Sequence, residues 1–145
     1  MQRTLLLAFI CFGCLGFTGS LLAQESVPMP KPDQEAVRAA EAWLALVDAG
    51  KYAESWKAAA SYLKSVVKEK KWLATMAPVR NPLGNVISRK LKSSEFTREL
   101  PGAPDGQYFV IQFTTQFANK TSAIETVTPV KDKDGQWRVS GYLIK

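Results

Sequence analysis

Residues 108–117 read YFVIQFTTQF. The odd positions from Phe109 to Phe117 alternate strictly with the even positions from Tyr108 to Gln116. Successive side chains of a strand point to opposite faces of a sheet, so an alternation of this length predicts a half-buried β-strand. This strand is the clearest element of the chain and sets the fold class.

Turn signals on both sides extend the strand into a meander. Before it, residues 101–106 contain two prolines and the Asp105-Gly106 turn signal. Asn119-Lys120 predicts a tight turn into a strand over residues 121–130, and the segment 132–135 (DKDG) predicts another turn into a strand over residues 137–144. The result is three consecutive antiparallel strands.

A further strand is expected between Gly84 and Leu100. Its apolar positions, Ile87 and Leu91 and then Phe96 and Leu100, change parity in the middle. An inserted residue restores one common face, so we predict a β-bulge at Ser93-Ser94 that bends a long strand.

The part of the chain before Gly84 is helical in pattern. Asp33 is the predicted cap of a first helix that ends at Gly50, and a second helix starts near Lys51, with a tail that breaks near Ser65. A third, shorter helix is expected around residues 72–79 and is stopped by Pro78. The expected fold is therefore α+β: about three N-terminal helices packed on a bent, cone-like C-terminal antiparallel sheet of about four strands, as one domain over residues 33–145.

The N-terminus is typical of a cleaved secretory signal peptide over residues 1–23. It combines Arg3, an apolar run from Leu5 to Phe17 and a small residue, Ala23, at the expected cleavage site. An uncleaved anchor, or a lipoprotein acylated at Cys14, is the rival interpretation. Residues 24–32 contain three prolines and are expected to form a flexible leader. We therefore expect export to the periplasm or the extracellular medium, with no stable membrane span after cleavage.

Composition excludes several kinds of chemistry. The chain of 145 residues has no histidine, and both of its cysteines, Cys11 and Cys14, fall in the predicted signal. Zinc enzymes and Ser-His or Cys-His nucleophile pairs are therefore excluded, and no metal site or cofactor is expected. The net charge of +6 becomes +5 when Arg3 is removed with the signal. The positive charges are scattered and lack interleaved aromatic residues, so nucleic acid is not an expected partner.

Two segments, residues 39–56 and residues 100–108, resemble a bacterial family of exported proteins catalogued as domain of unknown function 4019. The resemblance continues through residues 113–130 and the ending 137–142. That family carries no assigned activity, so the resemblance implies no catalytic residues. More distantly, the order of elements is similar to the nuclear-transport-factor-two-like cone fold, a layout that hosts enzymes as well as purely binding domains.

Enzymes of that layout place an acidic residue on a strand that points into the pocket. The acids on the predicted strands are Glu95, Glu99 and Glu125, and Glu125 is the best placed for burial. Burial would adapt it to act as a general base, with Tyr108 or Tyr142 as hydrogen-bond donor. The alternative is a surface glutamate paired across strands with a lysine or arginine.

A second candidate is a polar and aromatic face of the sheet with one parity, formed by Tyr108, Gln112, Gln116, Arg138 and Tyr142. An arginine among tyrosines and glutamines suits a carboxylate or phosphate ligand. The same residues would serve equally as a solvated outer face or as a homodimer surface.

These observations favour a small exported, non-catalytic domain that binds a small ligand or an envelope protein. One alternative is a pocket enzyme of proton-transfer or hydrolytic type that uses Glu125. The other is a basic binder of the envelope surface, drawn by the net positive charge.

Overall fold

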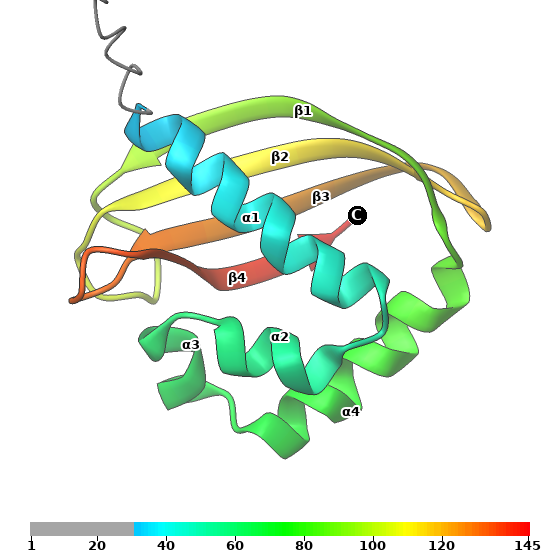
Figure 1. Cartoon of the computed structure of the whole chain (residues 1–145), viewed down its shortest axis with the longest axis horizontal. Coiled ribbons are helices and arrows are strands. Elements are labelled where there is room, and N and C mark those ends of the chain that lie inside the picture. Colours follow the sequence, from blue (N-terminus) through cyan, green and yellow to red (C-terminus); the bar gives the residue numbers. More distant parts are fainter. Residues whose placement is uncertain (1–30) are drawn as a thin grey trace, which may run out of the picture.

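Four antiparallel strands form one bent sheet in the order β1-β2-β3-β4 (Figure 1). This computed structural model describes residues 31–145, so the predicted signal peptide and residues 24–30 of the predicted leader lie outside the described residues. The strands are β1 (Val86–Thr97), β2 (Tyr108–Phe117), β3 (Lys120–Lys131) and β4 (Trp137–Ile144). The helices precede the sheet in the chain, which confirms the predicted α+β class.

The helical part has four α-helices and one short 3₁₀ turn among the described residues. They are α1 (Pro32–Asp48), α2 (Tyr52–Ala58), α3 (Ser61–Val66), α4 (Glu69–Arg80) and η1 (Asn81–Leu83). Helix α1 crosses one face of the sheet, and α2, α3 and α4 lie beside the β4 edge and below α1 in the view (Figure 1). We call the helix-covered face the inner face.

Helix α1 begins two residues earlier than predicted. Its N-cap is Lys31, which makes no capping side-chain bond, and Pro32 occupies the first helical position, where its fixed φ angle fits and no N–H is needed. Asp33 is therefore not the cap. It lies with Glu35 in the first turn, where a negative charge interacts favourably with the helix dipole.

The predicted second helix is two helices: it ends at Val66, close to the predicted break near Ser65, but an additional break at Ala59-Ala60 was not predicted. The Ala60 N–H donates to the Val139 carbonyl of β4 at 2.8 Å, so the chain leaves the helix to meet the edge of the sheet. Both alanines are fully buried. Only a small side chain allows the chain to approach strand β4 this closely.

Pro78 does not stop α4, which continues to Arg80 and ends where the sequence also predicts a turn, at residues 81–84. Proline removes one helical hydrogen bond, but Trp72, Met76 and Arg80 follow one another at four-residue spacing and are all buried. The free energy gained by burying this face of α4 exceeds the free energy lost with the one helical hydrogen bond.

The bulge in β1 lies within one residue of its predicted place. Leu91 pairs with Phe113 and Ser93 with Gln112, so Lys92 is the extra residue. A second irregularity, between Val86 and Ser88, was not predicted, and the strand ends at Thr97, before Leu100.

The core lies between the inner face and the helices. The odd residues of β2 are buried, as the alternation predicts: Phe109 is 7% exposed, and Ile111, Phe113, Thr115 and Phe117 are at most 1% exposed. Phe109, Ile111 and Phe113 belong to the same buried layer as Leu44 and Val47 of α1. No helix within residues 31–145 has both the length and the apolar character needed to cross a bilayer.

Candidate functional site

Glu125 lies fully buried on the inner face of β3, and its carboxylate is completely paired. Arg89 of β1 donates from Nε to Oε2 at 2.7 Å and from Nη2 to Oε1 at 3.2 Å. The Thr115 hydroxyl donates to Oε2 at 2.5 Å, and the Tyr142 hydroxyl donates to Oε1 at 2.6 Å. Each carboxylate oxygen therefore accepts two hydrogen bonds.

The ion pair continues to the end of α1. Asp48 accepts from Arg89 Nη1 at 2.7 Å and from Arg80 Nη2 at 3.0 Å. Arg80, 4% exposed, also donates to the Gly84 carbonyl and lies 4.5 Å from the Phe117 ring centre. Two cations and two anions thus join α1, α4, β1 and β3. We call Asp48, Arg80, Arg89 and Glu125 the buried charge network.

The pKa shifts follow from this pairing. Burial raises the pKa of Asp48, but the hydrogen bonds and charges of Arg89 and Arg80 outweigh it, and the net pKa is below the ordinary value. The stability that Asp48 contributes is therefore present above about pH 4 and is lost as the pH falls through the lower folded-state pKa. Burial, then the negative charge of Glu125, raises the pKa of Tyr142, which keeps its hydroxyl protonated as a donor.

This geometry meets the general-base hypothesis only in part. Glu125 is buried and Tyr142 donates to it, as that hypothesis requires, but Tyr108 lies elsewhere. Glu125 does not line any of the four main pockets of residues 31–145, and a guanidinium pairs with it. A general base needs a free acceptor within reach of substrate, so the surroundings of Glu125 favour a structural ion pair. Glu125 is paired with an arginine, as the alternative interpretation predicted, but the pair lies inside the molecule and not on its surface.

The residues of the predicted polar face are not brought together. Gln112 and Gln116 lie on the outer face of β2, opposite Thr126 and Ser88 respectively. Tyr108 is 2% exposed and donates to the Pro104 carbonyl at 2.6 Å. Its ring packs with Ala60 and Val130 in a small separate cluster.

Tyr142 lies on the opposite face from Arg138. Thr128 pairs with Gly141 and Pro129 with Val139, so Ser140 is an extra residue and reverses the parity of β4 after it. Tyr142 thereby reaches the inner face, where its ring packs edge-on against Trp43 at 5.3 Å. The assumption of one parity along β4 was wrong, and Gly141 beside the extra residue was the available signal.

Arg138 is already occupied by two acids of the β3–β4 turn. It contacts Asp132 at 3.2 Å and Asp134 at 2.8 Å. This pairing satisfies the carboxylate-binding capacity that the sequence suggested for Arg138.

The pair predicts a measurable titration. The hydrogen bond from Arg138, followed by the one from the Gln136 amide, lowers the pKa of Asp134 to about 2. In Arg138→Gln the pKa of Asp134 is expected to rise toward its ordinary value of about 3.9. Carboxyl-detected NMR over an acid titration measures both values. An unchanged Asp134 midpoint in the variant contradicts the assignment, and Asp105, which does not contact Arg138, is the internal control.

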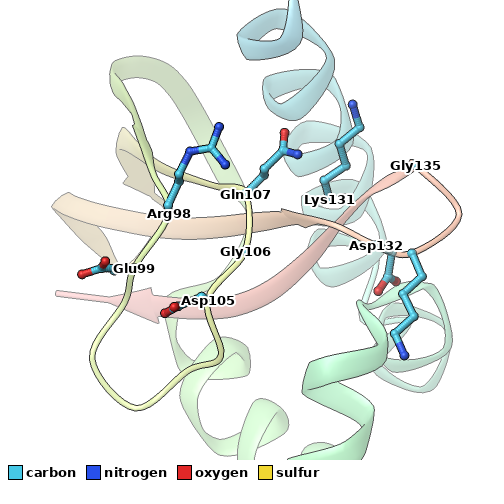
Figure 2. Close-up of a pocket in the computed structure, with 9 residues that line it drawn as sticks. Arg98, Glu99, Asp105, Gly106, Gln107, Lys131, Asp132 and Gly135 are labelled. Carbon is cyan, nitrogen blue, oxygen red and sulfur yellow. The ribbon is translucent and has the colours of Figure 1, made fainter.

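A separate pocket of about 640 Å³ opens where β1 and β3 end (Figure 2). It lies between the β1–β2 connection and the β3–β4 turn. We call it the open-end pocket, and its lining residues are Arg98, Glu99, Asp105, Gly106, Gln107, Lys131, Asp132, Lys133 and Gly135.

Three hydrogen-bond donors form a row across this pocket. The Gly106 amide donates to the Arg98 carbonyl and the Lys131 amide to the Gln107 carbonyl, each at 2.9 Å, which sets Arg98, Gln107 and Lys131 side by side. Their side chains point the same way in Figure 2, whereas Glu99 and Asp105 point away from them. We call these three residues the donor row.

The two cations of the donor row lie over aromatic rings. Arg98 lies 5.7 Å from the centre of the Phe96 ring, and Lys131 lies 5.7 Å from that of Trp137. Within residues 31–145, neither cation forms an ion pair. The sequence reasoning missed this row. The available signal was the position of these residues in the sequence. Arg98 and Gln107 flank the turn predicted over residues 101–106, and Lys131 directly follows the strand predicted over residues 121–130.

The described residues contain no group of three side chains arranged to hold a metal ion. No curated protein and no solved structure matches the chain. The likeness to the nuclear-transport-factor-two-like cone layout stays a prediction. The family model described as "Protein of unknown function (DUF4019)" matches residues 39–142, which run from α1 into β4. The chain therefore belongs to the DUF4019 family.

Proposed function

We propose that this protein is an exported, non-catalytic domain that binds a small anion, a carboxylate or a phosphate, in the open-end pocket. The observation that carries the proposal is the donor row: two cations that form no ion pair within residues 31–145 and one side-chain amide, side by side at the open-end pocket. The N-terminal pattern of Arg3, the apolar run and Ala23 supports export.

The donor row suits a small anion by its chemistry. A guanidinium offers a planar fork of N–H groups that matches two oxygens of a carboxylate or phosphate. Lys131 adds a point charge, and the Gln107 amide adds a neutral donor. Phe96 does not line the pocket, but it is 49% exposed and its ring centre lies 5.7 Å from the Arg98 guanidinium, so it offers an apolar surface beside the donor row to the carbon skeleton of an organic anion.

The acids of the pocket favour a small ligand over a polyanion. Glu99 and Asp105 stand at the rim, where they repel an extended anionic surface. Asp132 is held by Arg138 and by Ser61, so it does not neutralise the donor row. A lipid bilayer or a nucleic acid is therefore the weaker match.

The enzyme alternative has less support. It needs Glu125 to accept a proton, but the buried charge network holds that carboxylate with two hydrogen bonds at each oxygen. The binding proposal requires no proton transfer.

Titration with inorganic phosphate tests the site. We expect saturable NMR shifts of the Arg98 Nε–H and the Gln107 side-chain amide, with a dissociation constant of about 1 mM at low salt. Lys131→Gln should weaken binding about tenfold, because it removes one of the two cations of the donor row. Benzoate, titrated in parallel, asks whether a carboxylate with an apolar ring binds more tightly.

The matched control is Lys120→Gln, which removes the same charge at the opposite end of β3. It should leave the titration unchanged. NMR shifts that do not saturate in the wild-type protein, or equal losses of phosphate affinity in Lys131→Gln and Lys120→Gln, would refute the proposed site. Either result would mean that phosphate is attracted only by the general positive charge.

A further inference from the structure

Strand β1 leaves its outer edge without a partner among the described residues. The sheet ends at β1, and no helix lies beyond that edge (Figure 1). Three large apolar side chains of this one strand are exposed: Ile87 at 61%, Leu91 at 51% and Phe96 at 49%. An edge strand of this length with exposed apolar residues is a ready template for pairing with another strand.

The charges on the same strand select the partner. Lys90 and Lys92 discourage pairing with an arbitrary strand, as edge lysines do. Lys90 pairs with Thr114 and Glu95 with Val110, so both side chains lie on the outer face. Both are exposed, and neither forms an ion pair within residues 31–145.

We infer that the edge of β1 binds a second copy of this chain, antiparallel, about a two-fold axis between Lys92 and Ser93. This register sets Lys90 opposite Glu95 of the second copy, and the symmetry makes the same pair twice. Opposite charges facing each other across strands stabilise the pairing, whereas like charges oppose it.

The bulge at Lys92 makes this register consistent on both faces. Residues directly opposite in a sheet must point to the same face. Lys90 and Glu95 have opposite parity in the sequence, and they share the outer face only because the extra residue lies between them. Leu91 and Ser94 share the inner face for the same reason and also lie opposite each other in this register.

Dimerisation in this register covers an apolar groove on the inner face of the sheet. Val37 of α1 and Leu91 and Ser94 of β1 line a hollow of about 330 Å³. In the proposed register, Leu91 of the second copy lies opposite Ser94, next to this groove. The exposed Leu91 side chain of each copy is thereby covered at the groove of the other.

Charge reversal tests the register. The protein is expressed from its full-length sequence, purified and followed by sedimentation velocity over micromolar concentrations. We expect a dimer, and Lys90→Glu or Glu95→Lys alone should raise its dissociation constant at least about tenfold, because two attractive pairs become repulsive. The double variant with both reversals should recover the wild-type value. Both side chains are exposed, so neither change threatens the fold.

The control is Lys70→Glu, the same charge change at an exposed position of α4. It should leave the dimer intact. A wild-type monomer at all concentrations overturns the inference. A dimer that is insensitive to both single reversals, or one that the double variant fails to restore, also overturns it and points to another face. Neither Lys90 nor Glu95 lines the open-end pocket. The proposed anion binding can therefore fail or hold whether or not this dimer forms.

Discussion

Replacing Arg89 with methionine should lower the free energy of unfolding by about 3–5 kcal/mol at neutral pH. Its guanidinium contacts both Glu125 and Asp48, and the side chain is only 15% exposed. Methionine fills similar space without charge, so Glu125 keeps its burial but loses its cation. An unpaired buried carboxylate costs far more than the packing that methionine supplies.

Urea unfolding followed by circular dichroism measures this change. Arg98→Met is the matched control, because it makes the same substitution on an exposed arginine just beyond β1. The control should stay within about 0.5 kcal/mol of the wild type. Equal losses in the two variants would mean that the buried charge network contributes no more than a surface arginine.

Phe113→Ala should lower the free energy of unfolding by about 3–5 kcal/mol as well. Phe113 is 1% exposed, and its ring belongs to the core that α1 closes over β2. Truncation removes the transfer free energy of the ring and leaves a cavity that the surrounding strands cannot fill.

Phe96→Ala makes the same chemical change on the same face of the sheet. Because 49% of Phe96 is exposed, its loss should amount to about 1–2 kcal/mol. The two variants are compared by the midpoints of their urea unfolding curves, with the denaturant slope (the m value) unchanged. A Phe96 variant as destabilised as the Phe113 variant would contradict the difference in exposure between the two rings.

The strands could be predicted because period two reports the faces of a sheet directly. The alternation of residues 108–117 gave the correct inner set, and the parity change between Leu91 and Phe96 placed the bulge beside Lys92. Of the acids on the predicted strands, Glu125 was the best placed for burial because it lies between Ile124 and Thr126 on a central strand, but a surface glutamate was the alternative. The structure buries it.

Features that depend on contacts distant in sequence could not be predicted. The break at Ala59-Ala60 requires the Val139 carbonyl, and α4 passes Pro78 because of what its buried face contacts. Tyr142 changes faces through one extra residue, which apolar periodicity over a short strand does not reveal. The donor row consists of charged and polar residues at strand ends, where no period applies.

The buried charge network also sets the order in which the domain can be completed. Asp48, Arg80 and Arg89 are synthesised well before Glu125 and Tyr142, which lie near the end of the chain. Until β3 and β4 emerge, Arg89 lacks its buried acid and α1 has no finished surface on which to dock. Because contacts of high sequence separation form slowly, the growing chain stays open until its last strands are available. The delay would serve the export that we propose, since a chain that has not yet folded remains competent for threading through a narrow channel.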